Sequence, residues 1–255
     1  MLFTKVPFLL RFFIELSYNG KVYHGWQNQP DVISVQEVLE KTLSTILKQN
    51  IAVVGAGRTD TGVHASQMFA HFDFENTLPD NIIFKLNSYL PKDIAIQSVF
   101  EVKADAHARF NAVSRTYNYK IATSKNVFNY DYAYALQKSL DVELMNTACD
   151  ILLQYSDFQC FSKVRTDVKT YYCTLMTAQW DFKKDELIFT IKADRFLRNM
   201  VRAIVGTLVN IGLGKLDVEK LHDILKSKDR GEAGFSVPAH GLYLVNVEYP
   251  EHIKK

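Results

Sequence analysis

The densest group of chemically active side chains lies in an eleven-residue segment that contains three glycines. Arg58, Asp60 and His64 occur there at short spacing, in the sequence Gly55-Ala-Gly-Arg-Thr-Asp-Thr-Gly-Val-His-Ala65. A glycine-bearing turn can hold a carboxylate above a sheet, where the carboxylate can act as a nucleophile or a base. The segment fits neither the dinucleotide-binding fingerprint nor a Walker phosphate loop. The alternative is an ordinary turn in which the aspartate caps its own backbone.

A second group of charged side chains follows a predicted hairpin. Arg195, Arg198 and Arg202 are spaced i, i+3 and i+7, so a helix over 195–211 would carry them as one stripe beside an apolar face. Such a stripe predicts contacts with phosphate groups or, for one arginine, an ion pair with a buried carboxylate. A solvated helix face is the alternative.

Basic and aromatic residues alternate in a third segment, from Ala108 to Tyr119. Surfaces on which unpaired nucleic-acid bases stack have this composition. Tyr117, however, shares its strand face with Tyr119 and Ile121, so a position in the hydrophobic core is the alternative for this side chain.

Patterns typical of metal sites and of other catalytic classes are not found. The seven histidines and three cysteines form no HExxH motif and no CxxC pair, and the chain has no GxSxG elbow. We therefore expect no metal. The odd number of widely spaced cysteines indicates a reducing compartment rather than a disulfide framework.

The composition indicates a folded protein. Hydrophobic residues make up 47% of the 255 residues and charged residues 23%, which excludes disorder as the main state. The net charge of +2 points to no polyanionic partner for the chain as a whole, so any basic surface must be local. No segment approaches the eighteen uncharged apolar residues of a membrane span. We expect a cytoplasmic protein without membrane contact.

The spacing of hydrophobic residues predicts two successive sets of antiparallel strands and helices. Ser34-Val-Gln-Glu37 forms a capping box for the first helix, and Asp141 caps a later one. The predicted elements are a strand at 11–18, a helix at 35–49, strands at 51–54 and 64–74, a helix from 80, strands at 94–102 and 115–122, a helix at 142–154, hairpin strands at 171–181 and 187–193, helices at 195–211 and from 217, and a strand at 241–249. The fold class is therefore α+β, with a first half at 1–105 and a second at 106–255.

Taken together, these segments resemble the tRNA pseudouridine synthase A family, TruA. The resemblance covers nearly the whole chain, and its most specific block surrounds Asp60. Thr61 stands where the family usually has alanine. The matching blocks are Leu16–Gly20, Tyr23–Gln27, Gly57–Ala65, Arg109–Asn111, Arg115–Tyr117, Phe196–Gly206 and Pro238–Tyr243.

The resemblance implies that uridine is converted to pseudouridine at three consecutive positions on the 3′ side of the tRNA anticodon loop and stem, without cofactor or metal. It also implies a homodimer. By the same match, Asp60 is the catalytic carboxylate and Arg58 assists the flipping of the target nucleotide. Tyr117 stacks on the flipped base and Arg202 pairs with Asp60. Arg195 and Arg198 are candidates for binding the substrate through its phosphates.

The expected architecture is two related RRM-like halves, each with helices packed on one side of an antiparallel sheet, and an active-site cleft between them. The first half carries Asp60, and the second carries Tyr117 and Arg202. A noncatalytic RRM-like RNA-binding protein is the alternative, although the chain lacks the RNP1 pattern. A glycoside or nucleoside hydrolase is a third possibility, but the usual pair of catalytic carboxylates is not apparent.

Overall fold

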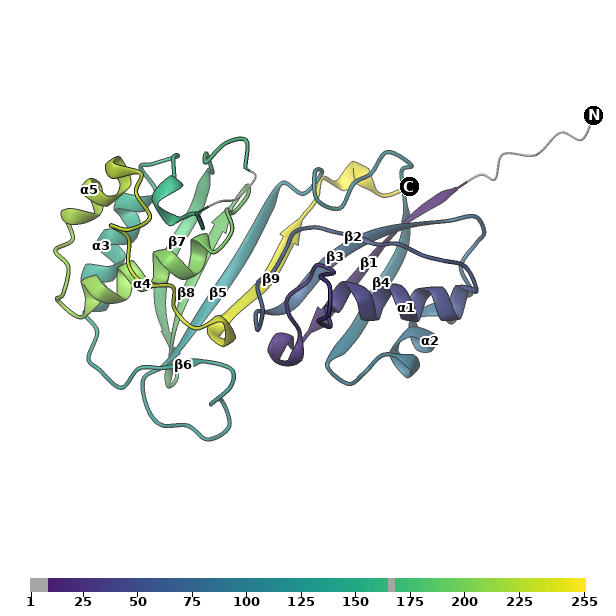
Figure 1. Ribbon diagram of the computed structural model, residues 1–255, viewed down its shortest axis with the longest axis horizontal. Helices are drawn as coiled ribbons and strands as arrows, with labels where there is room; N and C mark the ends of the chain where they lie inside the picture. Colours follow the sequence, from purple (N-terminus) through teal and green to yellow (C-terminus); the bar gives the residue numbers. More distant parts are fainter. Residues whose placement is uncertain (1–8, 165–167) are drawn as a thin grey trace, which may run out of the picture. The chain divides into compact units, whose positions relative to one another are not determined.

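The protein has an α+β architecture, as predicted. A computed structural model describes residues 9–164 and 168–255 (Figure 1). The chain divides into two compact units, of which the first comprises 1–113 together with 247–255 and the second comprises 114–246. The last nine residues therefore belong to the same unit as the first strand.

The first unit is built around β1 (Leu10–Tyr18). This strand lies between β3 (His64–Phe74) and β4 (Ile94–Val102) and is antiparallel to both. The two-residue strand β2 (Val54–Gly55) extends the sheet beyond β3. The alternation of apolar and polar residues predicted β1, β3 and β4 almost to the residue, because strands of eight or more residues carry a long period-2 pattern.

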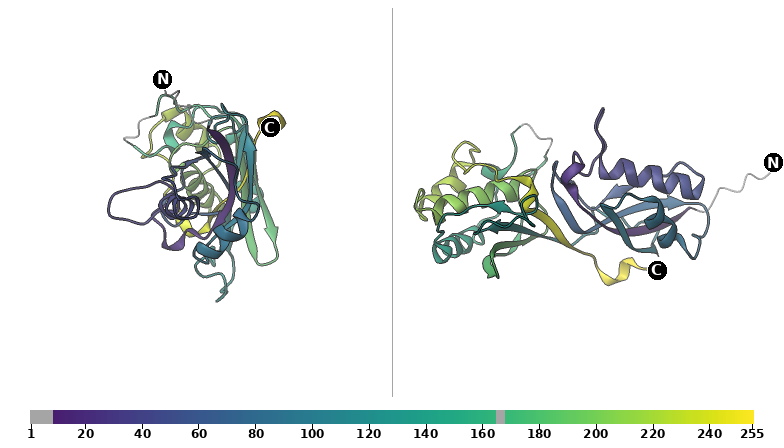
Figure 2. Two further views of the ribbon diagram at one scale, coloured as in Figure 1. Left: turned by 90° about the vertical axis from the view of Figure 1, so that its right-hand side faces the viewer. Right: turned by 90° about the horizontal axis from the view of Figure 1, so that it is seen from below.

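Two helices complete the first unit. The hydroxyl group of Ser34 accepts a hydrogen bond from the Glu37 amide at 3.1 Å, so Ser34 is the N-cap of α1 (Val35–Leu47), while the Glu37 carboxylate pairs with Lys41. The second helix, α2 (Ile82–Tyr89), contacts both α1 and β4. Both helices lie on one face of the strands (Figure 2).

The opposite face of β1 is also covered. The ring of Phe13 is fully buried, and its centroid lies 5.1 Å from that of Tyr249, which belongs to the C-terminal segment of the same unit. Phe69 and Phe100 contact the same ring. Burial on two faces explains why β1 carries apolar residues at consecutive positions in its first half.

The second unit contains three long antiparallel strands and a returning one. In sheet order these are β9 (Leu242–Glu248), β5 (Ser114–Ala122), β8 (Glu186–Ala193) and β7 (Leu175–Lys183). The short β6 (Tyr134–Ala135) pairs with β5 in parallel. The last two residues of β9 belong to the first unit, so this strand carries the chain back to it.

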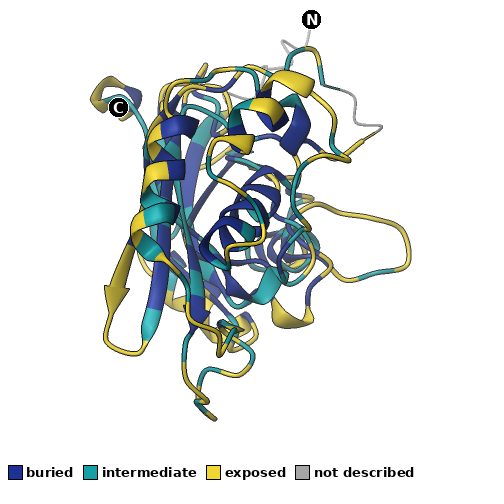
Figure 3. Cartoon of the chain, turned by 90° about the vertical axis from the view of Figure 1, so that its left-hand side faces the viewer, coloured by how far each residue is buried: buried dark blue, intermediate teal, exposed yellow. Residues whose placement is uncertain are grey.

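Three α-helices pack in the second unit. Asp141 caps α3 (Val142–Leu152) by accepting a hydrogen bond from the Leu144 amide at 2.9 Å. This helix contacts β7, α4 (Met200–Gly212) and α5 (Lys220–Ser227). Buried residues gather on the strands and on the helix faces turned toward them (Figure 3), and α4 is buried along nearly its whole length.

The predicted start of the α4 helix at Arg195 is wrong, because the helix begins at Met200. Asp194 accepts hydrogen bonds from the Arg195 amide at 2.7 Å and from the Thr174 amide at 2.8 Å, which fixes the chain in a turn. Asn199 then adopts a left-handed conformation with φ 67°. Arg195 and Arg198 therefore do not form a helical stripe with Arg202.

Two smaller differences concern short elements. Only Val54 of the predicted strand at 51–54 pairs in the sheet, and this strand continues to Gly55. The helix expected from 217 begins at Lys220. Single-turn 3₁₀ helices occupy Gly20–Val22, Gln159–Phe161, Ala239–Gly241 and Glu251–Ile253.

Candidate active site

Asp60 lies in the turn between β2 and β3. The residue is half-buried, and Arg58, two positions earlier, is exposed. The Val63 amide donates a hydrogen bond to the Asp60 carbonyl at 3.1 Å, which closes the turn. The predicted candidates thus occur together on one structured loop.

The residue before Asp60 is held on both sides. The hydroxyl groups of Tyr18 and Thr59 lie 2.9 Å apart in a buried contact, and the Trp26 amide donates to the Thr59 carbonyl at 3.2 Å. Thr59 itself is only 9% exposed. These contacts fix the backbone directly before Asp60, which limits the positions open to the Asp60 side chain.

The loop that contains Trp26 fits closely against the Asp60 turn. Gly25 has φ 87°, and a β-carbon at this position would lie 2.3 Å from the Thr59 carbonyl oxygen. Only glycine allows both the positive φ and this approach of two backbones. The Gly62 amide adds a hydrogen bond to the Tyr23 carbonyl at 3.3 Å.

Tyr23 and His64 support these two loops. The Tyr23 hydroxyl donates to Asp93 at 2.6 Å, and its burial raises the pKa of the phenol, so it stays protonated. Nδ1 of His64 accepts a hydrogen bond from the Gly20 amide at 3.1 Å. His64 is 2% exposed, and this bond to backbone ties the start of β3 to the segment that follows β1.

Tyr117 lies near the start of β5 in the second unit, where its ring is partly exposed. Its ring meets that of Phe196 edge-on, with centroids 5.2 Å apart and planes at 90°. Tyr119, two residues along the same face, is fully buried and donates to the Pro238 carbonyl at 2.8 Å. The strand thus passes from accessible at Tyr117 to core at Tyr119, so Tyr117 keeps a surface on which a base can stack.

Arg202 lies on α4 in the second unit and is half-buried. Its Nε donates to the Val237 carbonyl at 2.7 Å, and the Val237 amide donates to the Arg202 carbonyl at 3.3 Å. Burial raises the pKa of Tyr119, an effect that the nearby Arg202 guanidinium partly offsets. The pairing of Arg202 with Asp60 remains a prediction.

Arg195 and Arg198 lie on the turn that precedes α4. Arg195 is half-buried, and its guanidinium is 3.5 Å from the Thr170 carbonyl. Arg198 is exposed, and its carbonyl accepts a hydrogen bond from the Lys163 amide at 3.0 Å. Phosphate binding by these two residues also remains a prediction.

Cysteine chemistry does not contribute to the candidate site. The three cysteines are buried free thiols. Burial raises the pKa of Cys160 to about 12, so it does not ionise to a nucleophilic thiolate near neutral pH. Among the residues that the structure describes, no group of His, Cys, Asp and Glu side chains is arranged to hold a metal ion, and no helix there could span a membrane.

Sequence reasoning missed the residues that position the candidates. The roles of Tyr18 and Trp26 at Thr59, and of Phe196 at Tyr117, depend on contacts between segments far apart in the chain. The only signal in the sequence was that Tyr18, Trp26 and Phe196 lie in blocks shared with a known family.

A family model described as tRNA pseudouridine synthase matches residues 16–111 and 149–250. Three relatives, each named tRNA pseudouridine synthase A, match most of the chain. The protein from Bacteroides thetaiotaomicron is 54% identical over 247 residues, which cover 95% of this chain and 92% of that protein. The protein from Parabacteroides distasonis is 50% identical, and the match covers 95% of this chain and 97% of that protein. The protein from Porphyromonas gingivalis is 49% identical, and the match covers 96% of this chain and 99% of that protein.

Among solved structures, a chain of a partial Cas6-RT-Cas1–Cas2 complex matches with a TM-score of 0.24 and 10% sequence identity. The match covers all of this chain and 48% of that chain. A similarity at this level carries no inference about fold.

Proposed function

Since this chain belongs to the tRNA pseudouridine synthase family, we propose that it isomerises uridine to pseudouridine in tRNA and that Asp60 is its catalytic carboxylate. The observation that carries this assignment is the fixed backbone of the Asp60 turn, which Tyr18 and Trp26 hold through Thr59. A carboxylate on such a rigid loop is suited to act on a substrate placed against it.

The proposed reaction breaks the bond between C1′ and N1 of the uridine, rotates the base and forms a bond between C1′ and C5. The proton at C5 leaves and N1 gains a proton, so atoms and electrons balance without a redox cofactor. During the exchange the sugar becomes electron-poor, and an ionised carboxylate can trap or stabilise it. The part that Asp60 takes in the reaction is attack on the sugar, attack on the base or removal of a proton, and all three routes require its negative charge.

The other candidate residues make the target base accessible and hold it. A base inside a stem must be extruded, which costs a few kcal/mol. Arg58 is exposed beside Asp60 and is proposed to occupy the vacated space. Tyr117 is proposed to stack on the flipped base and Arg202 to pair with Asp60. Arg195 and Arg198 are proposed to contact phosphates.

The finer features of this proposal come from the family resemblance. They are action at three consecutive positions on the 3′ side of the anticodon loop and stem, a cleft between two RRM-like halves at 1–105 and 106–255, a homodimer, and a cytoplasmic location. No cofactor or metal is assigned to the reaction.

Nucleoside analysis of the product tests the reaction itself. Unmodified tRNA transcripts are incubated with purified protein and a chelator, digested to nucleosides and quantified. We expect pseudouridine to appear in an amount equal to the uridine lost. Loss of uridine with release of free uracil would instead indicate a hydrolase, and tight tRNA binding without any pseudouridine would indicate a noncatalytic RNA-binding protein.

A further inference from the structure

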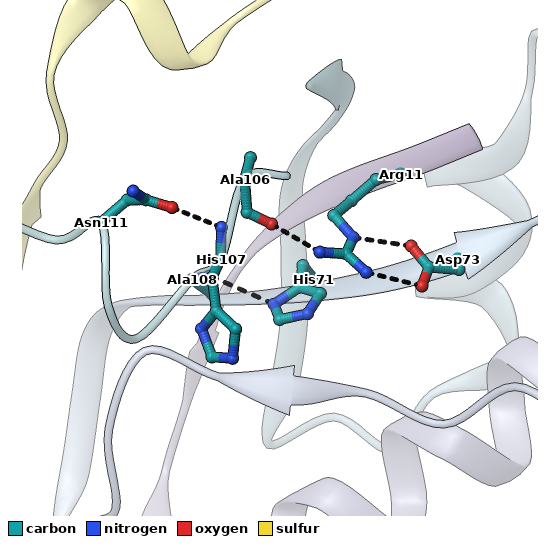
Figure 4. Close-up of polar contacts among 7 residues, drawn as sticks. All are labelled: Arg11, His71, Asp73, Ala106, His107, Ala108 and Asn111. Carbon is teal, nitrogen blue, oxygen red and sulfur yellow. Dashed lines mark hydrogen bonds and ion pairs between the residues drawn. The ribbon is translucent and has the colours of Figure 1, made fainter. Parts of the chain in front are cut away.

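A second feature of the first unit concerns the turn over residues 107–111, which the proposed mechanism does not use. Its backbone is held by side chains from three other parts of the unit. Arg11 donates to the Ala106 carbonyl at 2.9 Å, His71 accepts from the Ala108 amide at 3.1 Å, and the Tyr249 hydroxyl donates to the Ala108 carbonyl at 2.6 Å. Figure 4 shows Arg11 and His71 converging on this backbone from β1 and β3.

The turn is also closed by its own residues. The Asn111 side chain accepts a hydrogen bond from the His107 amide at 2.6 Å, and the Asn111 amide donates to the His107 carbonyl at 3.0 Å. Nδ1 of His107 accepts from the Arg109 amide at 3.1 Å. So many contacts on five residues fix the turn before any ligand arrives, which lowers the entropic cost of binding.

This rigid turn displays an aromatic ring and a cation to solvent. The Phe110 side chain is 75% exposed, although its ring contacts the His107 ring at a centroid distance of 4.3 Å. The Arg109 guanidinium carbon lies 5.7 Å from the centre of the Phe110 ring. An exposed ring on a preformed turn, with a guanidinium beside it, has the composition of a surface on which a nucleic-acid base can stack.

The charges around the turn favour an anionic partner. Asp73 is held in a two-pronged ion pair by Arg11, and Glu101 is paired with Lys255. Lys103 lies next to the C-terminal segment through a hydrogen bond from its amide to the Ile253 carbonyl, and Lys254 lies over the Phe100 ring. Asp73 and Glu101 are thus paired with cations of the same unit, while the turn itself carries the exposed Arg109, with the exposed Asp105 as an opposing charge before the turn.

We infer that the 107–111 turn is a second RNA-contacting site, where an unpaired base of the tRNA substrate stacks on Phe110 and Arg109 meets an adjacent phosphate. This inference rests on the proposed function, because it takes tRNA as the substrate. Stacking on an aromatic ring accepts any base, and an arginine beside the ring adds cation–π and phosphate contacts. The site therefore strengthens tRNA binding without taking part in the chemical step.

The test compares Phe110→Ala with Phe84→Ala, measuring tRNA affinity at several salt concentrations and the rate at saturating tRNA. Phe84 is a matched control because it lies in the same unit and is 72% exposed. We expect Phe110→Ala to weaken tRNA binding by about 10-fold, Phe110→Trp to restore it, and Phe84→Ala to have no effect. The saturated rate should be unchanged in all three variants.

The salt dependence separates the two parts of the site. Phe110→Ala should leave the slope of log affinity against log salt unchanged, because stacking releases no counterion, whereas Arg109→Ala should reduce the slope by about one. Thermal unfolding checks that each variant is folded.

Wild-type tRNA affinity in Phe110→Ala would overturn the inference, whether its sedimentation is normal or is altered, and altered sedimentation would assign the turn to a contact between copies of this chain. Either leaves the proposed function in place. Conversely, wild-type protein that binds tRNA without making pseudouridine would contradict the proposed function, while the affinities of the variants would still test the site.

Discussion

The hydroxyl group of Tyr18, at the end of β1, lies 2.9 Å from the hydroxyl group of Thr59, the residue directly before Asp60. The contact is buried, and the other side of Thr59 accepts a hydrogen bond from the Trp26 amide. The central strand of the first unit therefore helps to fix the backbone next to the candidate carboxylate. We expect this contact to affect the rate through the position of Asp60.

Tyr18→Phe should lower the saturated rate by about 10-fold, because a small displacement of a catalytic group costs much of the benefit of positioning. Affinity for tRNA should stay within about two-fold, since binding depends chiefly on phosphate contacts. The loss of one buried hydrogen bond should lower the free energy of unfolding by about 1 kcal/mol. Steady-state kinetics and urea unfolding measure both effects.

Tyr243→Phe is the control for this variant, because it also removes a hydrogen bond of a tyrosine hydroxyl, here one donated to the Tyr132 carbonyl at 2.8 Å in the second unit. We expect it to leave the saturated rate unchanged. Equal rates for Tyr18→Phe and wild type would show that this contact does not position Asp60.

Gly25→Ala should reduce activity much more than Gly214→Ala does. Both glycines have positive φ, 87° and 67°, so both substitutions carry backbone strain of about 1 kcal/mol. Only at Gly25 would the added β-carbon meet the Thr59 carbonyl, whereas at Gly214 it meets nothing within 4 Å. Rates at saturating tRNA, compared with unfolding midpoints, separate displacement of the Asp60 turn from loss of stability. Equal activity in the two variants would contradict the proposed role of the Gly25 contact.

Phe196→Ala should lower the saturated rate, and Phe196→Tyr should largely restore it. The edge-on contact at 5.2 Å sets the orientation of the Tyr117 ring, and such aromatic pairs contribute about 1 kcal/mol beyond their buried area. If Tyr117 stacks on the flipped base, the loss should appear in the catalytic rate. The same substitution made in a Tyr117→Phe background should lower the rate only weakly. A Phe196→Ala enzyme with a normal rate would separate Phe196 from the function of Tyr117.

The stability of the first unit should fall as the pH is lowered from 6.5 to 4. His71 is 4% exposed, and burial, together with the positive charges of Arg11 and His107, lowers its pKa to about 4. In this window the unfolded chain binds a proton at His71 that the folded protein does not, so up to about 3 kcal/mol of stability is lost. The pKa of Asp73 is lowered below its usual value by Arg11, so Asp73 contributes only at still lower pH.

Urea unfolding at several pH values, for wild type and His71→Gln, measures this effect. Glutamine cannot take up the proton but can accept the hydrogen bond from the Ala108 amide. We expect a shallower decline of stability in the variant, with the remaining slope due partly to His107, whose pKa is also lowered by burial. Parallel curves for the two proteins would contradict the assignment to His71.

Elements with a strong local pattern could be predicted from the sequence. The N-caps Ser34 and Asp141 mark the starts of two helices, because each cap bonds to an amide only three residues away. The strand β3 is eleven residues long, so its alternating pattern is easy to detect. The start of α4 could not be predicted in this way. There the Asp194 side chain competes for backbone amides, and Asn199 takes a left-handed conformation, so the apolar period extends beyond the helix.

The candidate site likewise has a part that could be predicted from the sequence and a part that could not. The residue types around Asp60 could mark this loop as a candidate site because they are adjacent in the sequence. The contacts that hold this loop, from Tyr18 and Trp26, join residues more than thirty positions apart in sequence and depend on the packing of strands and loops. Phe196 was likewise hidden, because its predicted helical conformation would have placed it differently from the turn in which it meets Tyr117.

The most direct test of the central claim is the release of tritium from C5-labelled uridine in tRNA, measured in single turnovers for wild type, Asp60→Asn and the exposed control Glu75→Gln. We predict that Asp60→Asn loses at least about 1,000-fold in rate while it stays folded and binds tRNA like wild type. Glu75→Gln should match wild type. Tritium release by Asp60→Asn at the wild-type rate would contradict the assignment of Asp60 as the catalytic carboxylate.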